Sequence, residues 1–578
     1  MYAGRLSTSP ERLAAAAGMA AVGLALGQAL GAWLVRLPER VGRTLARVGL
    51  GVALAGAAFL FLQYRAAAGS GRGELNERNS DLPNVLLIIV DALRQDVLGA
   101  YGNERVQTPH VDGLAERGVL FENAFVQAPF TWSSFGSILT GKYPRRHGLV
   151  AMAPGLRMRR DANVTLPAHL KQALRGDGAR LEDGDYAGAT FMTGTLSQGS
   201  GLMSGFDCYF EALAGHELVY LDSRWSVYRS KLLLFLFKNK LTQRFDDRLV
   251  VTTAVDWLRV NAGRRFFAML HLYSTHTPYD PPAELKSMYA DPDYDGPIPY
   301  FYAKHRHAIE QGEYEPTEAD VEQIKNLYYA GTTQADGDVG IVLAELERQG
   351  VLDDTLVIFT SDHGEELNDH GLWEHNWMYQ TNLRIPLIMT WPNGLQGGVR
   401  VDAMVETVDI LPTVCDLLDL ELPPQDTEEE RIDGLSLVPL IRGEAARVKE
   451  FSFAENGLFL SIQDEAWKLI VRDDAFEGEG DGWERILSGA ITGTRLFHLA
   501  VDPHEMENVF AAQREEARRL YEALAEYDRG MPIPRADIRR SARDIEDERL
   551  FESLGYAGGV GDLDALEEGW GKEDDDKQ

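Results

Sequence analysis

The chain has 578 residues, 45% of them hydrophobic and 25% charged, and this ordinary composition excludes a mostly disordered or collagen-like protein. Its formal net charge of −32 disfavours nucleic-acid binding, because neutralising a phosphate backbone needs clustered Lys and Arg side chains. The two cysteines, Cys208 and Cys415, exclude a disulfide-stapled scaffold and a cysteine-rich zinc module, so stability must come from packing.

The N-terminal segment, residues 1–67, differs from the rest of the chain in charge and hydropathy. It carries seven arginines against two glutamates, a net charge of +5, which leaves −37 for the remainder. Leu13–Val35 is a run of 23 residues without a charge, enough for a helix that crosses a bilayer. The second apolar run, Val48–Leu62, has 15 residues. It crosses a bilayer only if the flanking polar side chains extend to the membrane surface. We predict a membrane anchor of one or two helices here, with a soluble core helix or a cleaved signal peptide as alternatives.

The arginines of this segment also predict its orientation. In a two-helix anchor the short loop between the helices carries Arg36, Arg40, Arg43 and Arg47. Arginine-rich short loops stay on the cytoplasmic side of a membrane. The body of the protein is then expected outside the cytoplasm, in the periplasm or outside the cell, tethered by a linker at residues 68–80.

Residues 81–445 alternate between strand-like and helix-like patterns. Continuous apolar runs, typical of strands buried on both faces of a sheet, occur at Val85–Val90, Phe266–Leu272, Leu356–Thr360 and Pro386–Thr390. Helical patterns lie between and after them, at Thr165–Leu174, Ile324–Leu346 and Ile410–Leu418. This alternation predicts an α/β domain with a doubly wound sheet flanked by helices.

Polar residues follow three of these strands at the point where each strand ends. Asp91 follows the first strand, Ser274–His276 follow the second, and Asp362 and His363 follow the third. In open α/β sheets, ligands bind outside the carboxyl ends of the strands. We therefore expect these side chains to converge on a functional site.

The C-terminal part of the chain has a different texture. Short strand-like pieces at Phe451–Phe453, Trp467–Val471 and Arg495–Leu499 precede a helical pattern at Gln513–Tyr527. We predict a small α+β subdomain at residues 446–556. An acidic tail follows at 557–578, and its net charge of −6 from Gly561 onward predicts disorder.

Four sequence strings resemble the sulfatase branch of the alkaline phosphatase superfamily. They are VDALRQD (Val90–Asp96), TWSSFGSILTGKYPRRHG (Thr131–Gly148), TSDHGEEL (Thr360–Leu367) and RLFHLAVDPHEMEN (Arg495–Asn508). The strings follow the order of that family over roughly residues 81–556. The resemblance implies an alkaline-phosphatase-like mixed sheet and an ester hydrolase or transferase.

The resemblance places the nucleophile at Thr131, ten residues before Gly141 and at the start of a helix. Sulfatases carry Cys or Ser there, within C/S-x-P-x-R, and oxidise it to formylglycine. The run from Thr131 to Phe135 lacks the oxidisable residue, the proline and the arginine. Formylglycine hydrate expels sulfate through its second hydroxyl, which threonine lacks, whereas in-line attack can open a phosphothreonine. Thr131 thus favours phosphoryl transfer, with simple capping of the helix as the alternative.

The resemblance also implies a metal site. Asp91, Asp362 and His363 would hold one divalent ion, and Thr131 would complete the ligand set. An imidazole in place of an oxygen ligand shifts the preference toward manganese or zinc, with calcium or magnesium as alternatives. Ser274 stands where relatives have aspartate, which weakens the case for a second metal.

Two histidines receive roles from the same resemblance. His276, in STHTPYDPP, would serve the leaving-group or phosphoryl oxygen, and His375 would bind a nonbridging oxygen. His147 and His370 also fit family patterns, but each lies in a turn signal and is expected to fix that turn. An insertion at about Pro282–Thr317 is expected to shape substrate access.

The sequence therefore predicts a membrane-anchored, extracytoplasmic, metal-dependent hydrolase or transferase. Its substrate would be a phosphate ester or phosphodiester of a small molecule, lipid or glycan, cleaved through a covalent intermediate on Thr131. Two alternatives stay open, an arylsulfatase-like sulfuric ester hydrolase and a catalytically inactive envelope binding protein. The presence of Asp91, Asp362 and His363 argues against the second alternative, and the sequence leaves the oligomeric state open.

Overall fold

The computed structural model describes residues 82–150, 157–159, 162–173, 186–193, 200–213, 216–220, 247–477 and 480–532. The predicted anchor at 1–67, the linker at 68–80 and the acidic tail at 557–578 lie outside these ranges. Within them, no helix combines the length and the apolar character that crossing a bilayer requires. The domain boundaries drawn from the sequence stay predictions.

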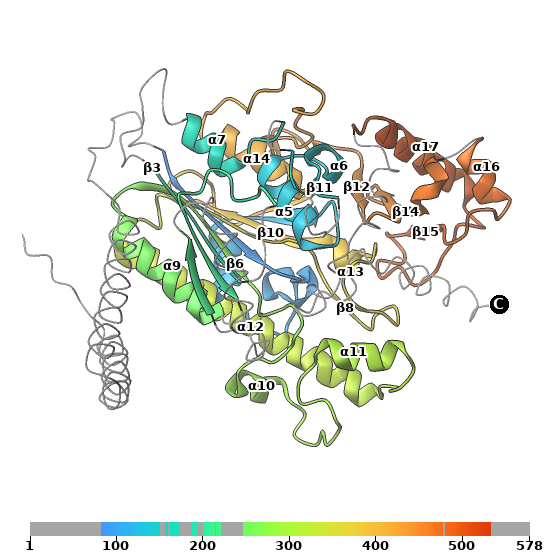
Figure 1. The fold of residues 1–578 in the computed structure, drawn as a ribbon, viewed down its shortest axis with the longest axis horizontal. Helices are drawn as coiled ribbons and strands as arrows, with labels where there is room; N and C mark the ends of the chain where they lie inside the picture. The colour runs from blue at the N-terminus through green and yellow to red at the C-terminus, as the bar shows by residue number, and fades with distance from the viewer. Residues whose placement is uncertain are drawn as a thin grey trace, which may run out of the picture. The chain divides into compact units, whose positions relative to one another are not determined.

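Among the described residues, nine strands form one mixed sheet in the order β11-β2-β10-β7-β1-β6-β3-β4-β5 (Figure 1). These strands are β1 (Asn84–Val90), β2 (Val119–Phe125), β3 (Tyr186–Thr193), β4 (Cys208–Leu213), β5 (His216–Tyr220), β6 (Arg265–Leu272), β7 (Thr355–Ser361), β10 (Arg384–Thr390) and β11 (Val399–Glu406). The central strand β1 pairs in parallel with β6 and β7, whereas β10 runs antiparallel to β7 and β2. A separate two-stranded ribbon pairs β8 (Glu366–Leu367) with β9 (Trp373–Glu374).

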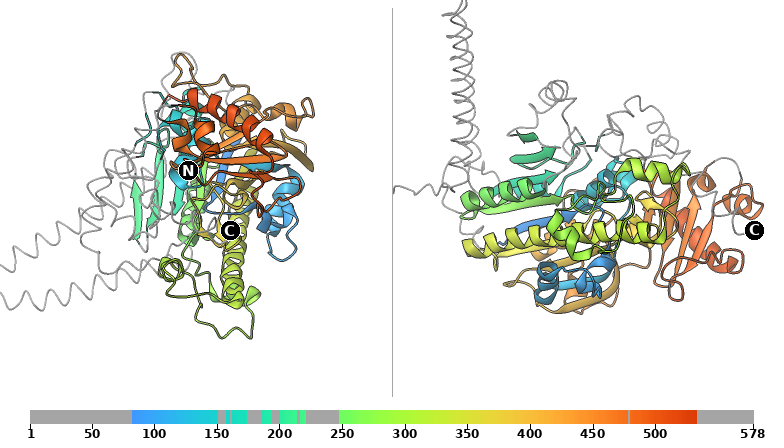
Figure 2. Two further views of the ribbon diagram at one scale, coloured as in Figure 1. Left: turned by 90° about the vertical axis from the view of Figure 1, so that its right-hand side faces the viewer. Right: turned by 90° about the horizontal axis from the view of Figure 1, so that it is seen from below.

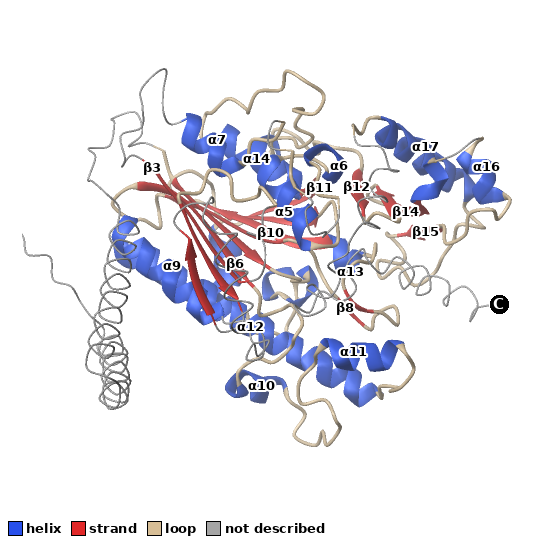
Figure 3. Cartoon of the chain, in the orientation of Figure 1, coloured by secondary structure: helices blue, strands red, loops and turns tan. Residues whose placement is uncertain are grey.

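Helices cover both faces of the sheet (Figure 3). The helices are α4 (Pro109–Arg117), α5 (Thr131–Thr140), α6 (Pro144–His147), α7 (Leu166–Ala173), α9 (Asp247–Asn261), α10 (Ala283–Tyr289), α11 (Ala303–Glu310), α12 (Glu318–Gln349), α13 (Gln380–Leu383), α14 (Ile410–Leu417), α15 (Val438–Ile441), α16 (Gly482–Leu487) and α17 (Arg514–Arg529). Short 3₁₀ helices are η1 (Gln95–Val97), η2 (Gly99–Tyr101), η3 (Thr407–Asp409) and η4 (Asp473–Phe476).

The alternation of side chains along β1 separates two hydrophobic cores. Val85, Leu87 and Ile89 pack in one core with apolar residues of α5, α7 and α14. The residues between them point to the opposite face, where α4, α9 and α12 supply the partners. Figure 2 shows α9 and α12 running side by side on that face. Since both faces are covered, β1 is apolar from Val85 to Val90, as its sequence predicts.

The C-terminal subdomain contains a four-stranded antiparallel sheet in the order β12-β13-β14-β15. Its strands are β12 (Ser452–Glu455), β13 (Phe459–Gln463), β14 (Trp467–Arg472) and β15 (Arg495–His498). Leu520 and Leu524 of α17 share a core with this sheet. Arg145 of α6 joins it to the main sheet domain through ion pairs with Glu455 at 3.2 Å and Asp528 at 2.7 Å.

The predicted strands and helices of the body are confirmed, with ends that differ by one to a few residues. Among the described strands, those that the sequence did not predict are β2, β3, β4, β5 and β11 of the main sheet, β8 and β9 of the ribbon and β13 of the C-terminal sheet. On one side of the main sheet, β2 carries the partly exposed Glu122 and Asn123, and the edge strand β11 carries the exposed Arg400 and Asp402. These two strands therefore lack the continuous apolar run that marks a strand buried on both faces.

Candidate active site

Asp91 and Asp362 lie side by side because the strands before them end together. The parallel strands β1 and β7 pair Val90 with Ser361, so the next residue of each strand is an aspartate at the carboxyl edge. His363 comes directly after Asp362, and all three of these side chains are buried. The sequence expectation that strand-end residues converge is confirmed here.

Local hydrogen bonds fix the orientation of Asp362 and His363. The Asp362 Oδ1 accepts from the backbone N–H groups of Ala92 at 3.3 Å and His363 at 3.0 Å. The Nδ1–H of His363 donates to the carbonyl of Gly364 at 2.9 Å. The other ring nitrogen, Nε2, lies 3.5 Å from Asp91 Oδ1 and 3.6 Å from Asp362 Oδ2. A histidine whose Nδ1–H is engaged in this way offers the Nε2 lone pair to a metal.

The three side chains fit a divalent metal ion. Their ligand atoms lie within 4.8 Å of one another. In the part of the chain that the structure describes, Oδ1 of Asp91 and Oδ2 of Asp362 are buried without a hydrogen-bond partner, and Oδ2 of Asp91 lies 3.2 Å from Nε2 of His271. Burial and the charge of Asp91 raise the pKa of Asp362 to about 6. A bound divalent cation would remove the cost of these buried carboxylates.

Thr131 joins this cluster from the first turn of α5. Its Oγ1 lies 3.4 Å from Nε2 of His363, and its side chain is buried. Every residue of α5 is buried, so the helix is held firmly between the sheet and its neighbours. Backbone N–H groups without helical partners point out of this helix end and favour a negatively charged group beside Thr131.

His276 and His375 complete the cluster. The His375 ring lies 4.4 Å from the His363 ring and 5.0 Å from the His276 ring, measured between centroids. The Nδ1–H of His276 donates to the Thr277 carbonyl at 2.6 Å. Burial lowers the pKa of His276 to about 4, so its ring is neutral at neutral pH. Burial also lowers the pKa of His375 well below its usual value, and the charges of His363 and His276 act in the same direction.

The structure thus brings together all the side chains that the sequence singled out. They are Asp91, Thr131, His276, Asp362, His363 and His375. Their individual chemical roles stay predictions.

The sequence reasoning missed two members of the site. His271, on β6, places Nε2 3.2 Å from Asp91 Oδ2. Burial opposes its protonation, but the contact with Asp91 and the charges of Asp362 and Asp247 together outweigh burial and raise the pKa of His271. Glu365, fully buried, places Oε1 3.3 Å from Nδ1 of His375. His271 lies inside an apolar strand run, so the only signal was a histidine in an otherwise apolar strand.

His147 and His370 hold turns, as predicted. The Leu149 N–H donates to Nδ1 of His147 at 3.1 Å, and Nε2 of His147 contacts the Ser137 hydroxyl at 3.3 Å. His147 thereby ties the turn after α6 to the helix that begins with Thr131. Nδ1 of His370 lies 2.9 Å from Oε1 of Glu366 on β8, across the turn between β8 and β9, and the His370 ring stacks on Tyr379.

We expect His147 to make the fold sensitive to acid. Burial lowers the pKa of His147 to about 3 in the folded chain, against 6.5 when unfolded. Below pH 6.5 the unfolded chain binds a proton that the folded chain does not. The free energy of unfolding therefore decreases as the pH is lowered, by up to about 1.4 kcal/mol per pH unit. Urea unfolding of the wild type and of His147→Gln at pH 7 and pH 5 measures this. The wild type should lose about 1.9 kcal/mol more than the variant. Equal losses would contradict the assignment.

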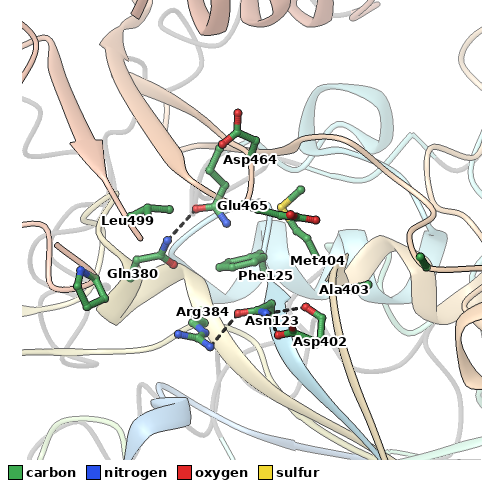
Figure 4. A pocket seen from close by; sticks show the side chains of 13 residues that line it. Asn123, Phe125, Gln380, Arg384, Asp402, Ala403, Met404, Asp464, Glu465 and Leu499 are labelled. Carbon is green, nitrogen blue, oxygen red and sulfur yellow. Dashed lines mark hydrogen bonds between the residues drawn. The ribbon is translucent and has the colours of Figure 1, made fainter. Parts of the chain in front are cut away.

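A pocket of about 350 Å³ lies outside this cluster, between β2, β11 and the turn after β13 (Figure 4). Its polar side chains bond to one another. Arg384 donates to Asn123 Oδ1 at 2.8 Å, and Asn123 donates to Asp402 Oδ1 at 3.1 Å. None of the metal-cluster side chains lines this pocket. The buried cluster at the strand ends is therefore the candidate active site.

Comparisons with known proteins agree with this site and fold. A family model described as Sulfatase matches residues 83–420, and one described as N-sulphoglucosamine sulphohydrolase, C-terminal, matches residues 368–528. An arylsulfatase of Clostridium perfringens is 25% identical over 476 residues, covering 75% of this chain and 92% of the relative. The multifunctional alkaline phosphatase superfamily protein PehA of Trinickia caryophylli is 27% identical over 489 residues, covering 74% and 91%.

Two solved structures show the same fold. A putative sulfatase, yidJ, from Bacteroides fragilis aligns with a TM-score of 0.59 at 20% identity, covering 81% of this chain and 99% of its own. The phosphonate monoester hydrolase of Agrobacterium radiobacter aligns with a TM-score of 0.57 at 22% identity, covering 79% and 95%. Since the sulfatase model spans more than half of the chain, the protein belongs to the sulfatase family of the alkaline phosphatase superfamily and is an ester hydrolase of that family.

Proposed function

We propose that this sulfatase-family protein acts on phosphate esters or phosphodiesters, with Thr131 as the nucleophile and one divalent metal ion as cofactor. The observation that carries the proposal is the position of Thr131 Oγ1, 3.4 Å from Nε2 of His363 beside the two buried aspartates. A threonine hydroxyl forms a phosphate ester that water or an alcohol can open. It lacks the second hydroxyl needed to expel sulfate by elimination.

In the proposed reaction, the Thr131 Oγ attacks phosphorus in line with the leaving oxygen. A new Oγ–P bond forms, and the bond from phosphorus to the leaving oxygen breaks. A divalent ion held by Asp91, Asp362 and His363 would lower the pKa of the Thr131 hydroxyl and offset charge on the phosphoryl oxygens. Water or an acceptor alcohol then attacks the phosphothreonine, the Oγ–P bond breaks, and Thr131 regains its proton.

The two remaining histidines handle the proton and the developing charge. His276 uses its Nδ1–H on the Thr277 carbonyl. Its Nε2, which lies 3.3 Å from the Tyr273 hydroxyl, is assigned to take the proton of Thr131 and return it to the leaving oxygen. His375 is assigned to a nonbridging oxygen of the phosphoryl group.

The relatives support both this function and one competitor. PehA is described as multifunctional within the alkaline phosphatase superfamily, which fits a site that accepts phosphate esters. The Clostridium relative is described as an arylsulfatase, and this favours sulfuric ester hydrolysis as the second candidate. The residue at position 131 decides our preference for phosphate esters.

The proposal includes a membrane anchor in residues 1–67, with the catalytic domain outside the cytoplasm. Its support is the uncharged run Leu13–Val35 and the arginine-rich segment that follows. A lipid or envelope glycan that carries phosphate would lie within reach of such an anchored enzyme.

One experiment tests the substrate class and the anchor together. The full chain is expressed, and separated membrane and soluble fractions are assayed with manganese or zinc on an aryl phosphate, a bis-aryl phosphodiester and an aryl sulfate. Activity should be in the membrane fraction. The kcat/KM for a phosphate substrate should be at least about 100-fold higher than the kcat/KM for the aryl sulfate, which corresponds to about 2.7 kcal/mol of transition-state stabilisation. Preference for the sulfate would favour the arylsulfatase reading. Metal binding without turnover would favour the inactive binding protein.

A further inference from the structure

His375 lies in a backbone segment that needs support from the rest of the fold. The residues on both sides of it, Glu374 and Asn376, have φ values of 61° and 84°. This left-handed region is unfavourable for residues other than glycine, because the Cβ atom crowds the backbone. Such conformations persist where surrounding contacts hold them, and they gather at functional sites.

The contacts that hold this segment come from distant parts of the chain. Arg306 of α11 donates from Nη1 to Oε2 of Glu374 at 2.7 Å, and these two side chains are only 8% and 4% exposed. On the other side of His375, the Asn376 carbonyl accepts from Nδ2 of Asn456 at 2.8 Å. The Asn376 N–H donates to the Pro129 carbonyl at 3.2 Å. The backbone of His375 is thus fixed from both sides.

Glu365 fixes the ring of His375. Oε1 of Glu365 lies 3.3 Å from Nδ1 of His375, so this contact engages one of the two ring nitrogens. The Glu365 side chain is fully buried. The other nitrogen, Nε2, is left for a reacting group. Because the His375 ring also lies 4.4 Å from the ring of His363, a small rotation would change its distance to the metal cluster.

Arg306 also balances the charge of this arrangement. Glu365 and Glu374 are two buried carboxylates that repel one another, and the positive charge of Arg306 acts on both. A buried carboxylate that loses its cationic partner is strongly unfavourable. Arg306 comes from the insertion between Pro282 and Thr317, which is connected to the loop after His276 by the bridge between Tyr279 and Phe301.

We propose that Glu365, Glu374 and Arg306 are positioning residues for His375, and that the insertion takes part in the reaction by supplying Arg306. Glu365 holds the His375 ring so that Nε2 faces a nonbridging oxygen of the substrate. The Arg306–Glu374 pair holds the strained segment on which His375 is carried. This inference rests on the proposed role of His375 in binding an oxyanion.

A double-mutant cycle on the metal-loaded full chain tests whether Glu365 acts through His375. Glu365→Ala should lower kcat/KM by about 10- to 100-fold, as is typical of groups that orient others in a site. In a His375→Ala background the same change should cost less than about 3-fold, because the residue it positions is gone. Arg306→Met should behave like Glu365→Ala in both backgrounds. Glu365→Gln should recover part of the loss because the amide oxygen remains a hydrogen-bond acceptor. Arg306→Lys should recover part of the loss because the positive charge remains.

The same double-mutant cycle can be measured by phosphate binding, which needs no turnover. It therefore separates failure of the proposed reaction from failure of the positioning role. The dissociation constant of inorganic phosphate should rise about 10-fold in Glu365→Ala, and adding Glu365→Ala to His375→Ala should raise it no further. This result would support positioning even if the chain turns over no phosphate ester. Equal effects of Glu365→Ala in both backgrounds, or no phosphate binding by the wild type, would overturn it.

The matched control is Lys468→Met on β14. Lys468 forms an ion pair with Glu505 that has the same 2.7 Å distance and similar burial to the pair of Arg306 and Glu374. This change should lower the melting temperature while kcat, KM and phosphate binding stay within about 2-fold of wild type. If Lys468→Met reproduces the kinetic losses of Arg306→Met, loss of stability explains both, and the positioning role is wrong.

Discussion

Replacing Thr131 with alanine is expected to lower kcat by at least about 10⁴-fold, because the hydroxyl that forms the covalent intermediate is lost. The chain should remain folded and should still bind a divalent metal through Asp91, Asp362 and His363. Wild-type chain that is quenched during turnover should carry an added phosphoryl group on the peptide containing Thr131. Steady-state kinetics and mass spectrometry of that peptide measure the two effects.

Thr140→Ala is the matched control for this change. Thr140 is a buried threonine in the last turn of α5, and its hydroxyl donates to the Gly136 carbonyl at 2.6 Å. Its loss should cost about 1 kcal/mol of stability and leave kcat nearly unchanged. Turnover that survives Thr131→Ala in a folded chain would contradict the assignment of the nucleophile.

Removing the metal is the second change for which we expect a large effect. Chelation of the wild type, or His363→Ala, should lower kcat by at least about 10³-fold, because charge on the transferring group is no longer offset. Manganese or zinc should restore the chelated wild type and leave His363→Ala inactive. Activity that persists in a chain shown by elemental analysis to hold no divalent metal would exclude a metal-dependent reaction.

Asp362→Asn separates catalysis from stability at the same site. Burial and the charge of Asp91 raise the pKa of Asp362, so its ionised form destabilises the metal-free fold. Asp362→Asn should therefore raise the melting temperature of the metal-free chain by a few degrees, about 1 kcal/mol or more, while abolishing the stabilisation that metal gives the wild type. Asp354→Asn, just before the opposite end of β7, is the matched control and should change neither. A metal-free Asp362→Asn chain that melts below the wild type would contradict this picture.

The sequence alone determined the central strands and the site residues that follow them, Asp91 and Asp362. Strands β1 and β7 are covered on both faces, so their apolar runs are visible without a structure. Asp91 and Asp362 follow these runs directly, and strands that end at the same edge bring the residues after them together. Thr131 was identified through the resemblance to the sulfatase branch, which places the nucleophile ten residues before Gly141.

The tertiary structure decided which charged groups surround those residues. Arg306 reaches Glu374 across 68 positions of sequence, and nothing local marks either side chain as buried. His271 faces Asp91 because its strand pairs with β1, although the run around it predicts only a core strand. Burial and charge pairing depend on which elements pack together. The residue pattern of one segment does not show which other elements pack against it. The same pattern does indicate where a strand or helix of that segment ends.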